Sequence, residues 1–390
     1  MRRLFYLVSL ISVFLSVATK ELTAADISDL TWSDDGGKIT ITACDTSASG
    51  ELVIPDTIDG MPVTSIGQSA FEKCRILENI SIPISVNTIG EEAFKQSGIT
   101  SINIPANVSS IGNYAFKFCN ELQSFQVVTE NTNFSSVNGV LFSKDKTILI
   151  AYPPAKLEGS YTVPDGVISI GEDAFLLSKN GSINIPNSVT SIGEDAFTAS
   201  ENLMMIEVDA DNTNFASVNG VLFDKDITSI IAYPSGRIEE SYSIPATVTS
   251  IGDDAFQSSK ITSIDIPAGV ISIGDDAFRG SGITSIMIPS SVLSIGEKAF
   301  SSTSLMMIEV ESFNKNFMSM DGVLFNRDMT TLIEYPDGKW ENYTIPSSVT
   351  KIGSYAFRDS GISIINIPGS VISIGDDAFR GSGISSIDIP

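Results

Sequence analysis

Residues 99–116 read ITSINIPANVSSIGNYAF, and close variants of this stretch recur along almost the whole chain at a spacing of about 22 residues. A fixed period of this size is typical of a solenoid, in which one small unit stacks on copies of itself. The most constant part is Ile-Gly-x-x-Ala-Phe, which occurs ten times, with its glycines at Gly67, Gly90, Gly112, Gly171, Gly193, Gly252, Gly274, Gly296, Gly353 and Gly375.

Each unit predicts the same local structure. The alternation of Ile102 and Ile104 indicates a short strand with one buried face, and Pro105 ends it because proline has no N–H for the ladder. A second apolar pair, Val108 and Ile111, precedes the glycine, where we expect a short 3-10 or helical turn. The phenylalanines of the phrase should stack inside the coil as an aromatic spine.

Fourteen strand motifs are found, and three of the thirteen gaps between them lack the glycine phrase. These gaps read NGVLFSKDKTILIAYP, NGVLFDKDITSIIAYP and DGVLFNRDMTTLIEYP. Asn-Gly or Asp-Gly between apolar runs is typical of a β-hairpin. We therefore predict a β-rich solenoid with three inserted β-hairpins, in coils near residues 129–160, 210–241 and 312–342.

The repeated phrase, the small Cys or Ser that follows its turn, and the NGVLF–KD–YP segments together resemble the BspA-like leucine-rich-repeat proteins. The stretch ELVIPDTIDGMPVTSIGQSAF at residues 51–71 is similar to the first repeat of that family, and the match covers about residues 27–390. The resemblance implies a leucine-rich-repeat solenoid on a secreted or surface-displayed protein, several of which bind host or matrix proteins. It implies no catalytic residues.

The two ends of the chain differ from the repeats. Residues 1–25 combine a basic start, an apolar run and small residues, which predicts a secretory signal peptide; the alternative, a membrane anchor, needs about 20 apolar residues. Residues 26–51 predict an N-terminal cap, and residues 52–390 the solenoid. The sequence stops within the phrase, at Pro390, which predicts a truncated array with an open end and end-to-end self-association.

Composition argues against several functions. A net charge of -24 disfavours nucleic acid as a partner, and the absence of histidine removes the commonest general base and metal ligand. No catalytic motif is present, so we expect no enzyme activity and no cofactor; a glycosidase-like use of the acidic pairs ranks last. Those pairs follow the repeat glycines, as at Asp275 and Asp276, and either bind calcium or are simply solvated.

Three cysteines are present. Cys74 and Cys119 occupy the same repeat column two coils apart, about 10 Å at the usual strand spacing, which is too far for a disulfide. Cys44 has no evident mate. We expect three free thiols.

The side chain between the two buried strand positions should point outward and form a recognition surface. The candidates are Asn103, Gln126, Asn184, Glu207, Asp265, Met287, Glu309 and Asn366. Tyr152, Tyr233 and Tyr335 of the hairpin coils either form a second surface or are packed strand ends. The favoured function is a secreted or cell-surface, non-catalytic adhesion protein with a matrix, host or envelope protein as ligand; the alternative is a structural or polysaccharide-binding envelope component.

Overall fold

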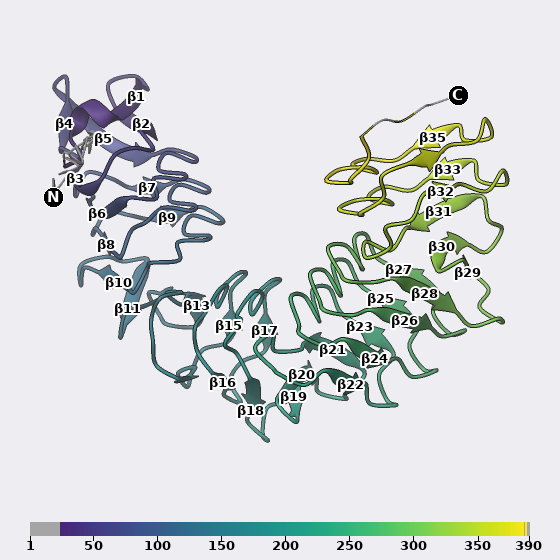
Figure 1. The fold of residues 1–390 in the computed structure, drawn as a ribbon. Coiled ribbons are helices and arrows are strands. Elements are labelled where there is room, and N and C mark those ends of the chain that lie inside the picture. Colours follow the sequence, from purple (N-terminus) through teal and green to yellow (C-terminus); the bar gives the residue numbers. More distant parts are fainter. Residues whose placement is uncertain (1–23, 386, 388–390) are drawn as a thin grey trace, which may run out of the picture.

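The computed structural model describes residues 24–385 and 387, and shows a β-solenoid bent into an arc (Figure 1). The expected signal peptide lies outside the described residues except for its last two positions, and so does most of the last strand motif, near Ile387. Strands such as β18, β26 and β28 lie on the outer side of the arc, and the turns after the repeat glycines lie on its inner side (Figure 1).

The N-terminal region begins with the one helix of the described residues, the 3-10 turn η1 (Ile27–Asp29). Asp26 caps it by accepting a hydrogen bond from the N–H of Ser28, and the side chain of Asp29 accepts one from the N–H of Asp26. Strands β1 (Leu30–Asp34) and β2 (Ile39–Cys44) form an antiparallel pair. Because β2 also pairs in parallel with β5 (Met61–Ile66), this region joins the stack directly.

The expected column of parallel strands is present. Thirteen of the fourteen motifs form described strands, and neighbours pair in register, so that Ile102 lies beside Ile80 and Phe125. The column consists of β3 (Gly50–Val53), β6 (Leu77–Ser81), β8 (Ser101–Ile104), β10 (Ser124–Val127), β14 (Ser160–Thr162), β16 (Ser182–Ile185), β18 (Met205–Val208), β22 (Ser241–Ser243), β24 (Ser263–Asp265), β26 (Ser285–Ile288), β28 (Met307–Val310), β32 (Tyr343–Thr344) and β34 (Ile365–Asn366).

A second column, which the sequence indicated only as an apolar pair, consists of two-residue strands just before the glycines. Its members are β7 (Thr88–Ile89), β9 (Ser110–Ile111), β15 (Ser169–Ile170), β17 (Ser191–Ile192), β23 (Ser250–Ile251), β25 (Ser272–Ile273), β27 (Ser294–Ile295), β33 (Lys351–Ile352) and β35 (Ser373–Ile374). The glycine that follows must lack a side chain: a Cβ on Gly274 would lie 2.6 Å from the backbone nitrogen of Asp253. Neighbouring coils therefore approach one another closely at this point.

The turn after each glycine is not helical. Its second residue has a left-handed backbone, with φ between 50° and 61° in all ten copies. Alternate N–H groups therefore point at the next coil. In the second glycine-bearing turn, the N–H of Glu92 donates to the carbonyl of Asn113 at 3.0 Å, that of Phe94 to the carbonyl of Ala115 at 2.8 Å, and that of Gln96 to the carbonyl of Lys117 at 2.9 Å. We call these three parallel bonds the turn ladder. A helical turn would direct the same N–H groups back along its own chain.

The aromatic spine forms, but in four separate runs. Consecutive rings are 5.1–5.8 Å apart, as for Phe256 on Phe278 and Phe278 on Phe300. Buried side chains fall into four hydrophobic clusters that meet at the hairpin coils. In each hairpin coil a tyrosine takes the place of phenylalanine: Tyr152, Tyr233 and Tyr335 stack on the next phenylalanine at 5.4, 5.2 and 5.1 Å.

Each hairpin coil contains an antiparallel meander of three strands, one more than expected. The meanders are β11 (Phe134–Val137), β12 (Val140–Ser143) and β13 (Ile148–Ala151); β19 (Phe215–Val218), β20 (Val221–Asp224) and β21 (Ser229–Ala232); and β29 (Phe317–Met320), β30 (Val323–Asn326) and β31 (Thr331–Glu334). Asn138 and Gly139 both have positive φ, as a tight hairpin turn requires. The carbonyl of Gly139 accepts from the N–H of Phe125 at 2.8 Å, so the hairpin occupies the edge of β10 and interrupts the strand column.

A buried asparagine fixes the start of each meander, and sequence reasoning missed it. In the second meander Asn212 donates from Nδ2 to the carbonyls of Pro186 and Val189, both at 2.9 Å. Its Oδ1 accepts from the N–H groups of Asn214 and Phe215, both at 2.8 Å. Asn131 and Asn314 repeat this pattern. One side chain thus ties the hairpin coil to the coil before it.

We expect Asn212→Ala to lower the free energy of unfolding by about 3 kcal/mol, because it leaves buried backbone groups without partners. Asn214→Ala, which removes the same amide from an exposed site two residues away, should change it by less than about 0.5 kcal/mol. Urea unfolding followed by circular dichroism checks both values, and equal effects would show that Asn212 has no such role.

Candidate functional site

The eight predicted surface residues all lie on the outward side of the strand column. Seven are exposed and Asn184 is half-buried. The column is divided into separate sheets at the three hairpin coils and again between β24 and β26, so Asn103 lies beside Gln126, Asn184 beside Glu207 and Met287 beside Glu309. Asp265 and Asn366 stand in two further sheets. The structure therefore gives several short patches in place of one continuous surface.

Not all of these side chains are available to a partner. Asn184 donates to the hydroxyl of Thr162 at 3.0 Å, and Asn366 donates to that of Thr344 at 3.1 Å. These amides form ladders along the sheet.

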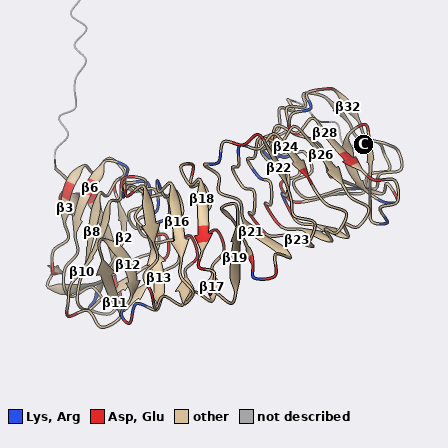
Figure 2. Ribbon diagram, turned by 90° about the horizontal axis from the view of Figure 1, so that it is seen from below, with Lys and Arg blue, Asp and Glu red and all other residues tan. Residues whose placement is uncertain are grey.

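Two methionines that the sequence analysis did not identify, Met205 and Met307, join the predicted Met287 on the outward face and make it partly apolar. Met307 is 42% exposed, and the neighbouring Met287 is 45% exposed beside Glu309. Met205 is 39% exposed, on the same strand as Glu207. The period of two along each strand could have revealed Met205 and Met307, since they stand two positions before the predicted Glu207 and Glu309. We call Met287, Met307 and Glu309 the outer patch; Figure 2 shows acidic segments on β18 and near β28.

The hairpin tyrosines do not form a recognition surface. Tyr152, Tyr233 and Tyr335 are 2%, 4% and 0% exposed, so their interpretation as a second recognition surface is wrong and the packed alternative is correct. They are buried because each continues the aromatic spine. Burial raises the pKa of Tyr335 to about 12.

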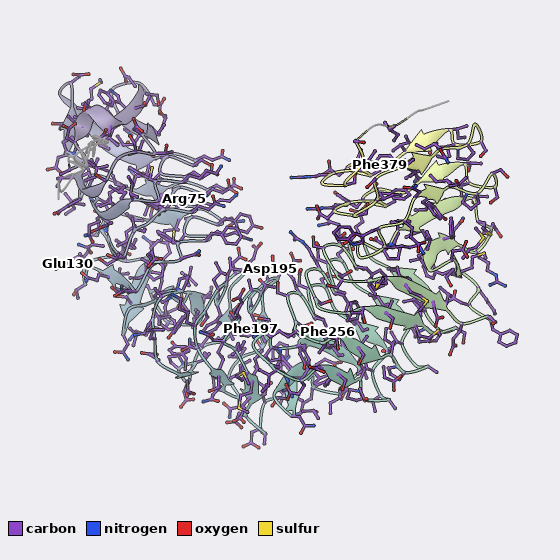
Figure 3. The ribbon with its side chains drawn as sticks, in the orientation of Figure 1. Arg75, Glu130, Asp195, Phe197, Phe256 and Phe379 are labelled. Carbon is purple, nitrogen blue, oxygen red and sulfur yellow. The ribbon has the colours of Figure 1, made fainter. Side chains whose placement is uncertain are left out.

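The acidic pairs line the inner side of the arc, where Figure 3 places Asp195, whereas Glu130 lies on the outer side. Asp254 is half-buried, and burial together with the charge of Asp195 raises its pKa to about 7. Across the described ranges, no group of three or more acidic or cysteine side chains is arranged to hold a metal ion.

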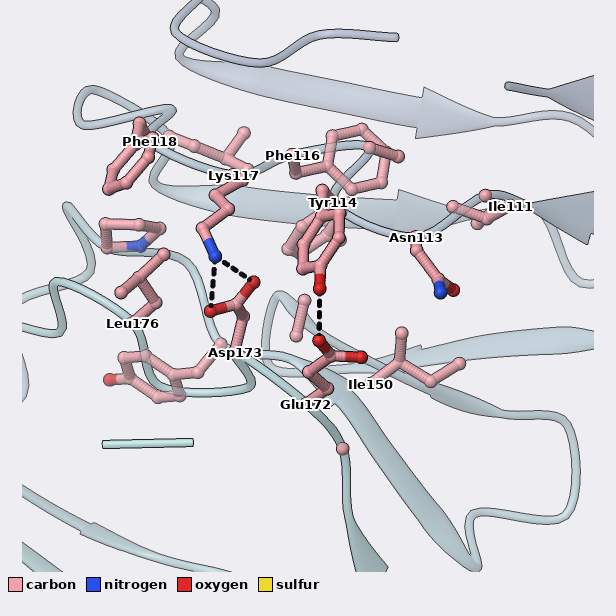
Figure 4. Close-up of a pocket in the computed structure, with 18 of the residues that line it drawn as sticks. Ile111, Asn113, Tyr114, Phe116, Lys117, Phe118, Ile150, Glu172, Asp173 and Leu176 are labelled. Atoms are coloured by element: carbon pink, nitrogen blue, oxygen red, sulfur yellow. Dashed lines mark hydrogen bonds and ion pairs between the residues drawn. The ribbon is translucent and has the colours of Figure 1, made fainter. Parts of the chain in front are cut away.

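The first junction between spine runs contains a cavity of about 240 Å³ (Figure 4). We call it the first junction pocket; its apolar lining includes Phe116, Leu122, Phe125, Ile150, Tyr152 and Leu176. The Tyr114 hydroxyl donates to Glu172, and Lys117 pairs with Asp173 at 2.9 Å, so both contacts cross from the coil before the hairpin to the coil after it. The bond to Glu172 raises the pKa of Tyr114 to about 12, and burial raises that of Asp173. Sequence patterns gave no sign of this pocket.

The cysteines are free thiols in the structure, and all are buried. Cys119 donates to the carbonyl of Phe94 at 3.0 Å, and it shares with Cys74 a column whose other members have small hydroxyl side chains. The expectation that Cys44 has no evident mate is wrong, since the thiol of Cys74 lies 3.9 Å from the carbonyl oxygen of Cys44 and both thiols contact the carbonyl oxygen of Asp45. The N-terminal region folds back over the first turn and brings them together.

Four stretches, residues 44–158, 155–235, 235–338 and 334–390, match the family described as the BspA type leucine rich repeat region, with six copies. The chain therefore belongs to the BspA-type leucine-rich-repeat family. No curated protein matches it. Within the described residues no helix is long and apolar enough to cross a membrane.

Solved structures of leucine-rich-repeat proteins are similar along most of the chain. A protein from Eubacterium ventriosum is 22% identical over 93% of this chain and 95% of its own, with a TM-score of 0.49. A leucine rich cell surface protein from Faecalibacterium prausnitzii is 24% identical over 92% and 94%, with a TM-score of 0.41. The pneumococcal vaccine antigen PcpA is 18% identical over 89% and 100%, with a TM-score of 0.43.

Proposed function

We propose that this chain is a secreted or cell-surface protein that binds another protein without catalysis, through the outer patch. The observation that carries the proposal is the pair of exposed methionines on adjacent strands, with Glu309 in register beside Met287. Methionine adapts its shape to a partner, and carboxylates add charge selectivity. With a net charge of -24, the protein fits a partner with a basic surface.

Export is supported by the signal-like pattern of residues 1–25 and by the family. The absence of histidine and of a catalytic motif supports a non-catalytic role.

The test is binding to a panel of purified extracellular-matrix proteins with a triple variant, Met287→Ser, Met307→Ser and Glu309→Gln. We expect one or more matrix proteins to bind and the variant to lose at least tenfold in affinity. The control variant Asn103→Ala with Gln126→Ala, on the outward face of β8 and β10, should keep full affinity. Equal loss in both variants, or binding to polysaccharides alone on a glycan array, would contradict the proposal.

A further inference from the structure

The first junction pocket stands where the turn ladder is interrupted. In uninterrupted stacks the three N–H groups of one turn donate to three carbonyls of the next, and the phenylalanine ring covers the ring before it. At this junction the N–H groups of Tyr114, Phe116 and Phe118 find no acceptor among the described residues. The hairpin coil lacks the glycine phrase, so both the carbonyls and the stacking ring that would complete the ladder are missing.

The third junction shows that an acceptor oxygen suits such open donors. There Asp337 accepts a hydrogen bond from the N–H of Thr303 at 3.2 Å, one residue after Ser302, which holds the third ladder position. The corresponding residue at the first junction is Pro154, whose side chain offers no acceptor. The N–H groups of Lys298 and Phe300 at the third junction also lack an acceptor among the described residues. What marks the first junction is that its open donors stand at an apolar cavity of about 240 Å³.

The charged side chains at the rim of the pocket determine whether a charged or a neutral acceptor group of a ligand can bind there. Glu172 and Asp173 stand at the pocket with Lys117 as the one basic side chain in its lining, and Lys117 is already paired. A free carboxylate would meet repulsion there, whereas a backbone carbonyl would not. An aromatic side chain fits the apolar part. Phe94 has a stacked ring on both sides, whereas Phe116 stacks on Phe94 alone and meets Phe125 only edge-on, at 5.0 Å.

We propose that the first junction pocket binds a turn of a partner protein that inserts one aromatic side chain beside Phe116 and offers neutral backbone carbonyls to the N–H groups of Tyr114, Phe116 and Phe118. The partner segment replaces the turn that the hairpin coil lacks. This site is separate from the outer patch and does not depend on it.

The probe is a peptide of this chain's own turn that carries no carboxylate, acetyl-IGSYAFR-amide from residues 352–358, titrated into the full mature protein by fluorescence anisotropy. We expect saturable binding, at least tenfold weaker for the peptide with alanine in place of phenylalanine. Ala151→Leu fills the pocket and should weaken binding at least tenfold. The matched Ala232→Leu, at the smaller cavity of the second junction, should leave it unchanged.

Thermal melting confirms that both variants fold. Absence of binding at millimolar peptide, or equal affinity for the two peptides, would overturn the proposal, as would equal loss in the two variants. Because no matrix protein is used, this failure is distinct from that of the outer patch.

A second inference rests on separate contacts. Both thiols lie within hydrogen-bond distance of the carbonyl oxygen of Asp45, at 3.6 Å from Cys44 Sγ and 3.8 Å from Cys74 Sγ, so the two sulfur atoms face the same point. The interaction between the two thiols raises the pKa of Cys44 and lowers that of Cys74, which favours Cys74 as the attacking thiolate. Cys119 bonds instead to Phe94 and Ser97.

We infer that Cys44 and Cys74 form a disulfide when the chain folds in an oxidising compartment, and that this bond staples the N-terminal region to the first turn. Cys74 thiolate attacks a sulfur of an oxidant disulfide such as oxidised glutathione and releases one thiol. Cys44 then displaces the second thiol and forms the Cys44–Cys74 bond. The two cysteines lose two protons and two electrons, and the oxidant becomes two thiols.

The test is refolding of the mature protein with oxidised glutathione, followed by thiol counting in denaturant and peptide mass mapping. We expect one remaining thiol, Cys119, and a melting temperature several degrees above that of the reduced protein. Cys44→Ser should abolish that increase, and Cys119→Ser should keep it. Three titrating thiols, or a bond that includes Cys119, would overturn the inference whether or not the chain is exported.

Discussion

Phe278→Ala should lower the free energy of unfolding by about 4 kcal/mol, because it removes a fully buried ring from the middle of a spine run. Phe278 lies 5.1 Å from Phe256 and 5.8 Å from Phe300, so the cavity would separate two stacked coils. Urea unfolding monitored by circular dichroism gives the value.

Phe379→Ala is the matched control, since Phe379 is half-buried and stacks on Phe357 alone, at 5.2 Å. We expect a loss of about 1 to 2 kcal/mol there. A loss as large as that of Phe278→Ala would show that the spine does not propagate stability through stacked neighbours.

Glu334→Gln should raise the free energy of unfolding at pH 7 by about 2 kcal/mol, although it removes a charge from an acidic protein. Glu334 is 6% exposed, at the position held by Ala151 and Ala232 in the other hairpin coils. Burial and the charge of Asp337 raise the pKa of Glu334. Burial also raises that of Asp337, to about 7.

The sign of the pH dependence follows from these raised values. The folded state holds protons that the unfolded state releases above about pH 4, so stability falls as pH rises from about 4 towards 7 and beyond. In Glu334→Gln this slope should be smaller, with little change at pH 4. Thermal melting of both proteins between about pH 4 and about pH 7 measures this slope. If Glu334→Gln were destabilised equally at the two pH values, the buried-charge account would be contradicted.

The solenoid could be predicted because each repeat encodes its own local structure. The period of two at Ile102 and Ile104, the proline after it and the phenylalanine column each specify one feature, and the structure confirms the strand column and the spine. The Asn-Gly dipeptides placed the hairpins correctly for the same reason.

The remaining features depend on contacts between coils that no single repeat encodes. The turn after each glycine was expected to be helical, but its second residue, most often Asp or Glu, has a left-handed backbone. The hydrogen bonds of the turn ladder, which join two coils, determine this conformation. The first junction pocket exists because a hairpin replaces a turn, so it appears only when two coils are placed together. Cys44 and Cys74 likewise meet only after the N-terminal region folds over the first turn.

Amide hydrogen exchange read by NMR tests most directly whether each hairpin coil interrupts the turn ladder. The N–H groups of Phe94 and Phe278 donate to the next coil at 2.8 Å and should exchange slowly. Those of Phe116 and Phe197, each followed by a hairpin coil, have no acceptor among the described residues and should exchange at least a hundredfold faster. Equal protection of all four amides would contradict the account, because the ladder would then run unbroken through the hairpin coils.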